Sequence, residues 1–152
     1  MTTKIYLSQI EKISLMIDAK VEERYELLCL ATKITTSTEG ERVKSSPDPD
    51  KMTNIVEKIM KCEDEISENI GKLLEKKKKI VEQIDEIENP ELYNVLTLKY
   101  VQLMSDEEAM DNIHRSATHY YRLLRSALNE FETKFGNTYL NDGEKSQISS
   151  KW

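Results

Sequence analysis

A heptad pattern between positions 52 and 87 constrains this chain more than any other feature. Its positions alternate by four and three residues and are Met52, Val56, Ile59, Glu63, Ile66, Ile70, Leu73, Lys77, Ile80, Ile84 and Ile87. Such a stripe predicts a long helix that pairs with a second helix, because in water the stripe must be covered. We expect Asp50 to cap this helix, and polar Glu63 and Lys77 to fix the register of the pairing.

A second long helix is expected over residues 3–34. Its apolar stripe consists of Leu7, Ile10, Ile17, Val21, Leu28 and Ala31. Residues 35–50 contain Gly40, Pro47 and Pro49, so we predict a polar loop there, either flexible or functional. A loop of this length allows a long antiparallel helical hairpin, a coiled coil, over residues 1–88. The seam also suits pairing between chains, and we expect a homo-oligomer through the hairpin.

The residues after position 88 predict three shorter helices. Asn89 with Pro90 suits a helix start, Ser105 and Glu108 form a capping-box pattern, and Ser116 suits the N-cap of a third helix to about Lys134. Gly136 is the expected stop. The core side of the third helix is expected to hold Tyr120, Leu123, Leu124, Ala127, Leu128 and Phe131. The fold class is therefore all-α, with a small helix-turn-helix domain at residues 89–136 and a flexible tail at 137–152.

The charge distribution allows only a local nucleic-acid surface. The net charge is −6, which disfavours binding of phosphate by the molecule as a whole. Residues 112–129, however, contain no acid. In a helix-turn-helix the third helix lies in the major groove, where arginines suit guanine edges or phosphates. The residues expected to contact double-stranded DNA are Arg115, Ser116, Ala117, Thr118, Tyr121, Arg122 and Arg125.

Several other functions are not indicated by the residue patterns. No apolar run is long enough to span a membrane, and the first residues do not resemble a secretory signal. Cys29 and Cys62 are expected to be reduced thiols of a cytoplasmic protein, with a disulfide across the hairpin as the alternative. The chain has no phosphate-binding loop, nucleophile motif or metal-ligand spacing, so we expect no enzyme activity, no cofactor and no metal.

A resemblance to a known family sharpens this interpretation. Residues 4–45 resemble the N-terminal part of an uncharacterised protein family common in phages and prophages of Gram-positive bacteria. The C-terminal part is similar to sigma-factor region 4 and to the RinA/ArpU-like regulators of late phage genes. The matching residues are Tyr93-Asn94-Val95-Leu96, Lys99-Tyr100-Val101, Glu107-Glu108, Ser116, Arg122-Leu123 and Ala127-Leu128. The resemblance extends to about residue 135 and implies a phage-encoded, DNA-binding transcriptional regulator whose hairpin is a spacer or oligomerisation element.

Four positions differ from that family's usual pattern, one of them Ala109, which stands where the pattern has Ile. Asp106 and Arg115 stand where the pattern has aromatic residues, and Met110 stands where a small residue lets the two helices of the motif cross closely. We expect Met110 to separate these helices. The differences and the net charge of −6 favour an alternative function, an acidic helical module or inhibitor acting on a host protein such as RNA polymerase or a nucleic-acid-binding defence enzyme. A purely structural coiled-coil protein is a third interpretation.

Overall fold

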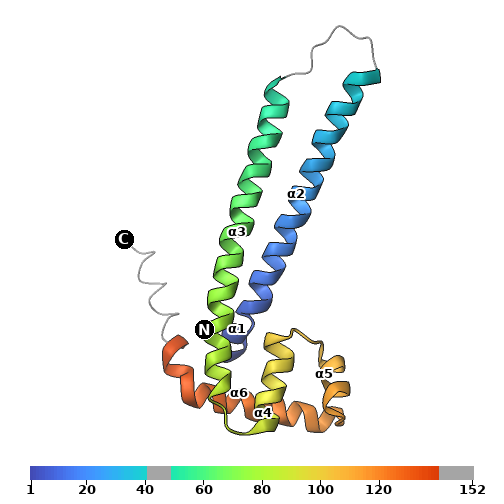
Figure 1. Ribbon diagram of the computed structural model, residues 1–152. Coiled ribbons are helices and arrows are strands. Elements are labelled where there is room, and N and C mark those ends of the chain that lie inside the picture. Colours follow the sequence, from blue (N-terminus) through green and yellow to red (C-terminus); the bar gives the residue numbers. More distant parts are fainter. Residues whose placement is uncertain (41–48, 141–152) are drawn as a thin grey trace. The chain divides into compact units, whose positions relative to one another are not determined.

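The computed structural model describes residues 1–40 and 49–140, and all secondary structure in these two ranges is helical (Figure 1). The predicted all-α class is therefore confirmed. The elements are α1 (Thr3–Leu7), α2 (Gln9–Gly40), α3 (Pro49–Asp85), α4 (Pro90–Leu96), the π-helix η1 (Thr97–Val101), α5 (Asp106–Ile113) and α6 (Ala117–Tyr139). The chain forms two compact units, one from Ile13–Leu73 and one from Met1–Lys12 with the residues from Leu74 onward.

The unit of residues 13–73 is a pair of antiparallel helical segments. The Lys20 ammonium lies 2.7 Å from a Glu65 carboxylate oxygen, and the Arg24 guanidinium lies 2.9 Å from Glu63, so later positions of α2 meet earlier positions of α3. On each helix a row of buried or partly exposed side chains recurs at alternating spacings of three and four residues. They are Ile13, Ile17, Lys20, Arg24, Leu27, Ala31 and Ile34 on α2, and Met52, Ile55, Ile59, Cys62, Ile66, Asn69 and Leu73 on α3.

The expected seam of α3 is wrong at every second position, where the residue in the seam is the one before the expected residue. Ile55, Cys62 and Asn69 are buried, whereas Val56 is 45% exposed, Ile70 is 43% exposed, and Glu63 and Lys77 are also exposed. On α2, Val21 and Leu28 are likewise exposed. The helices carry two neighbouring stripes one residue apart, and apolar spacing alone does not decide which of them forms the seam. Polar Lys20, Arg24 and Asn69 occupy seam positions, which a search for apolar residues passes over.

The expected boundaries of the two long helices at the loop are wrong. Helix α2 continues through Gly40 and α3 begins at Pro49, so Asp50 lies in the first turn and is not the N-cap. Proline is tolerated in a first turn because its missing N–H would have no helical partner there. Of the expected loop at 35–50, residues 41–48 lie outside the described residues.

The C-terminal helix is also longer than expected. Gly136 lies inside α6 and is buried, and α6 continues to Tyr139, which is only 1% exposed. The Tyr139 hydroxyl and Thr3 Oγ1 are 2.8 Å apart, so a contact with the start of the chain anchors the last helical turn. The prediction of a flexible tail concerns residues from 137 onward, and those from 141 lie outside the described residues.

The first residues of the chain pack with α6, and this packing was not expected. The ring of Tyr6 stacks on that of Tyr139 with centroids 4.3 Å apart, and the Tyr6 hydroxyl donates a 2.7 Å hydrogen bond to Gln83 Oε1. Phe131 lies 6.1 Å from the Tyr6 ring and has no exposed surface. Residues 1–12 therefore belong to the same compact unit as the C-terminal helices, although the expected domains separate them.

Candidate nucleic-acid interface

Local hydrogen bonds fix the start of each C-terminal helix. Asn89 Oδ1 accepts from the Glu91 N–H at 3.0 Å, and Ser116 Oγ accepts from the His119 N–H at 3.3 Å. Ser105 and Glu108 exchange the two bonds of a capping box, Ser105 Oγ accepting from the Glu108 N–H and Glu108 Oε2 from the Ser105 N–H. These three predicted caps are confirmed. Each satisfies N–H groups that have no partner inside the helix.

Packing orients α6 so that one side faces the protein. The buried residues of its first four turns are Tyr120, Leu124, Ala127, Leu128 and Phe131, and α6 packs mainly against α4 and α1. This agrees with the predicted core side except at Leu123, which is partly exposed. The opposite side of α6 is thereby directed to solvent.

All seven residues expected to contact DNA are exposed, namely Arg115, Ser116, Ala117, Thr118, Tyr121, Arg122 and Arg125. The Arg115 guanidinium lies 3.6 Å from a Glu91 carboxylate oxygen, so these two side chains form a long ion pair. Arg122 Nη2 lies 2.8 Å from His119 Nδ1. Among the described residues no carboxylate forms an ion pair with Arg122 or Arg125. Their two guanidinium charges are therefore available to an anionic ligand.

Asp106 holds three elements together at the start of α5. Its Oδ1 accepts hydrogen bonds from Lys99 Nζ of η1 at 2.5 Å and from the Tyr120 hydroxyl of α6 at 2.7 Å. The Lys99 bond, and next the Tyr120 bond, hold the pKa of the Asp106 carboxyl below its usual value of 3.8. Burial raises the pKa of nearby Tyr100 to about 12. A polar cluster thus occupies the position at which the pattern of the resembled family has an aromatic residue.

The connection between α5 and α6 is short and tightly turned. His114 ends α5 in the left-handed conformation with φ of 53°, two residues before the Ser116 cap. Ala109 has no exposed surface and Met110 is partly exposed, so the small residue turned inward is Ala109. Since α6 packs mainly against α4 and α1, α5 contributes less to its support.

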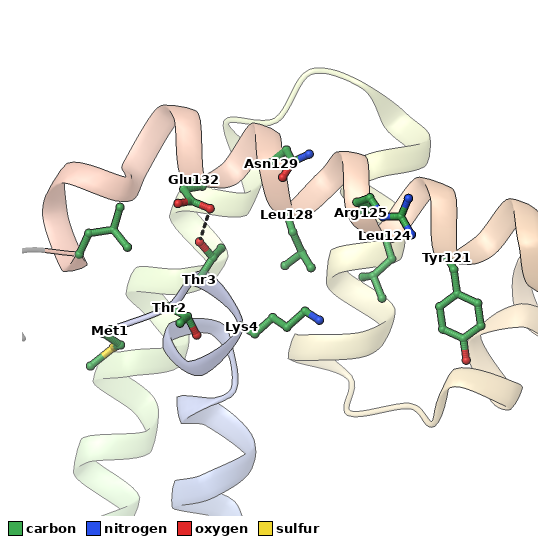
Figure 2. A pocket seen from close by; sticks show the side chains of 11 residues that line it. Met1, Thr2, Thr3, Lys4, Tyr121, Leu124, Arg125, Leu128, Asn129 and Glu132 are labelled. Atoms are coloured by element: carbon green, nitrogen blue, oxygen red, sulfur yellow. Dashed lines mark hydrogen bonds between the residues drawn. The ribbon is translucent and has the colours of Figure 1, made fainter.

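A groove of about 710 Å³ lies beside the exposed side of α6 (Figure 2). Residues Met1–Lys4 form one wall, and Tyr121, Leu124, Arg125 and Leu128 line the other. Figure 2 shows the Lys4 side chain extending below Leu128 toward Leu124 and Tyr121. Glu132 also lines the groove, and its Oε2 accepts a 3.1 Å hydrogen bond from Thr3 Oγ1.

Lys4 is therefore a candidate site residue that the sequence pattern did not indicate. It comes from the opposite end of the chain, and no local motif marks it. Within the part of the chain that the structure describes, Lys4 makes no ion pair. It adds a third available cation to those of Arg122 and Arg125.

Three general findings concern the described ranges 1–40 and 49–140. None of their helices is long and apolar enough to cross a membrane. Their His, Cys, Asp and Glu side chains form no group of three that could hold a metal ion. Cys29 and Cys62 are both free thiols, and burial raises the pKa of Cys62.

Comparison with known proteins places the chain in a family. A family model described as "Protein of unknown function (DUF1492)" matches residues 34–132, more than half of the 152-residue chain. The match excludes residues 4–33, which carry part of the resemblance noted in the sequence. Searches of curated proteins and of solved structures gave no match. The chain belongs to the DUF1492 family of proteins of unknown function.

Proposed function

We propose that this protein binds double-stranded DNA through the exposed side of α6 and regulates transcription, as a phage-encoded regulator. In this proposal α4, α5 and α6 form a sigma region 4-like helix-turn-helix. Helices α2 and α3 form the antiparallel hairpin that serves as a spacer or oligomerisation element. The observation that supports it best is the pair of exposed arginines, Arg122 and Arg125, on an acid-free stretch of an otherwise acidic chain.

The chemistry of the exposed side suits a duplex. The two guanidinium groups can each donate paired hydrogen bonds to guanine O6 and N7 or to a phosphate. Thr118 and Tyr121 suit phosphate or thymine-methyl contacts. Lys4, beside Arg125 in the groove, would contact a phosphate of the backbone and so add affinity without reading sequence.

The test is a fluorescence-anisotropy titration against duplexes from the DNA that flanks the protein's own gene. We expect selective binding by the wild type and a loss of about 100-fold or more in Arg122→Ala/Arg125→Ala, since each good base contact contributes about 1–3 kcal/mol. Lys72→Ala/Lys78→Ala is the matched control. It removes two exposed positive charges from α3, and we expect its affinity to remain close to that of the wild type.

Two results would contradict the proposal. One is the absence of binding by the wild type even at low salt, where phosphate contacts are strongest. The other is an equal loss in the α3 control, which would mean that only net charge matters.

The apolar groove favours a second candidate, a module that binds a host protein such as RNA polymerase. Leu124, Leu128 and Leu140 line it, and its volume suits an inserted apolar side chain of a partner. Leu140→Glu would place a charge in this groove away from Arg122. Loss of binding to purified RNA polymerase in this variant, with DNA binding absent in the wild type, would favour the second candidate.

A further inference from the structure

The helical pair of residues 13–73 leaves much of its apolar surface uncovered. No side chain of α2 between Ile13 and Ile34 is buried, although this segment is rich in apolar residues. On α3, Ile55, Cys62 and Asn69 are the buried side chains up to Leu73. A helix with apolar residues around much of its circumference is stable in water only when more than one side is covered. The α2–α3 seam covers one side.

The uncovered apolar residues form a second stripe on each helix. This stripe lies one residue after the seam and consists of Val21, Tyr25 and Leu28 on α2 and of Val56, Met60 and Ile70 on α3. All six are more than a third exposed. One residue corresponds to a rotation of about 100° around a helix. Because α2 and α3 are antiparallel, the same rotation brings both stripes to the same side of the pair, where they form one apolar face.

We propose that this face binds the same face of a second copy of the chain, so that two helical pairs form a four-helix bundle. A single surface patch that packs against itself is the usual interface of a two-fold dimer. Two-helix pairs commonly complete their core in this way. The proposal does not depend on DNA binding.

The charges on the face permit self-association despite the net charge of −6. Glu63 is the acidic residue at the middle of the α3 stripe, and it accepts hydrogen bonds from Arg24 Nε at 3.0 Å and Nη2 at 2.9 Å. Asp18 lies at the end of the α2 stripe, beyond Val21. The centre of the face therefore presents apolar side chains and a neutralised carboxylate, and two copies meet there without repulsion between unpaired charges.

The size of the face agrees with a stable dimer. Residues 13–34 of a helix extend over about 33 Å, and two packed helices are about 20 Å wide. The whole side of the helical pair that carries the face thus measures roughly 650 Å² per copy, or roughly 1,300 Å² for two copies, within the range of specific interfaces.

Sedimentation equilibrium of the full chain without DNA, from about 2 to about 200 µM, tests the proposal. We expect the mass of two chains for the wild type at the upper concentrations. Val56→Glu/Met60→Glu should raise the dimer dissociation constant by about 100-fold or more, because it would bury unpaired carboxylates. The control Leu15→Glu/Leu30→Glu changes two exposed leucines outside the face and should remain dimeric.

Thermal unfolding separates dissociation from misfolding. The melting temperature of a dimer rises with protein concentration, so we expect this dependence in the wild type and its loss in the face variant, with equal helix content by circular dichroism at low temperature. A wild-type mass of one chain across the whole range would overturn the proposal. A control variant that dissociates as readily as the face variant would overturn it too.

Discussion

The two compact units are both helical, but they bury their apolar residues very differently. In the unit of residues 13–73, helix α2 buries no side chain between Ile13 and Ile34, and ion pairs cross between α2 and α3. In the other unit α6 alone buries an aromatic and aliphatic row that includes Tyr120, Phe131 and Tyr139. Helical periodicity thus identifies both helices but does not identify their partners. The partner is determined uniquely only where several elements converge on one core.

The largest expected effect is a difference in stability loss when an apolar side chain is removed from one unit or from the other. Phe131→Ala removes a ring with no exposed surface and should lower the free energy of unfolding by about 3–5 kcal/mol. Leu15→Ala removes a side chain that is 61% exposed on α2 and lies outside the apolar face, and it should change the stability by less than about 0.5 kcal/mol. Urea denaturation at a fixed protein concentration measures both. Similar effects of the two substitutions would show that the units do not differ in this way.

A smaller effect compares a buried hydrogen bond with a partly exposed ion pair. Tyr6→Phe leaves the buried Gln83 Oε1 without its 2.7 Å donor and should cost about 1–2 kcal/mol. The Lys20–Glu65 pair is only partly buried, and solvent screening leaves it little net gain, so a double-mutant cycle should give a coupling smaller than the Tyr6 effect. A larger coupling for the ion pair would mean that charge, rather than packing, holds α2 to α3.

The smallest predicted effect is the pH dependence caused by Asp106. Its folded-state pKa lies below the ordinary value of 3.8, so its carboxylate stabilises the fold above pH 3.8, and this contribution is lost as the pH falls through the lowered pKa. Asp106→Asn should cost about 1 kcal/mol at neutral pH, since the side chain is partly screened by solvent, and should reduce the loss of stability in acid. Denaturation at several pH values measures this. Parallel curves for wild type and variant would contradict the assignment.

The features that the sequence predicted correctly are those determined by neighbouring residues. Asn89, Ser105 with Glu108, and Ser116 cap their helices through bonds that span two or three residues, so spacing was sufficient. The seam was misassigned because two stripes of similar apolarity lie side by side on α3. The last turn of α6, beyond Gly136, is held by a contact between Tyr139 and Thr3, and Thr3 is far away in the sequence.

In the candidate site, too, local sequence predicts some features, whereas others depend on packing between distant segments. Exposure of the seven expected residues follows from the periodicity of α6, because the core residues fix which side faces the protein. Their role in DNA binding stays a prediction. Lys4 joins Arg125 and Tyr121 only because α1 packs on α6, and no local pattern encodes that packing.

The salt dependence of DNA binding tests the central claim most directly. Released counterions make the logarithm of the binding constant fall linearly with the logarithm of salt concentration, by about 0.9 per neutralised phosphate. The account predicts a steep slope for the wild type, a slope that Lys4→Ala reduces by about 1 without changing sequence preference, and a relaxed preference in Arg122→Ala. No measurable binding at low salt, or a slope that none of these substitutions changes, would contradict it.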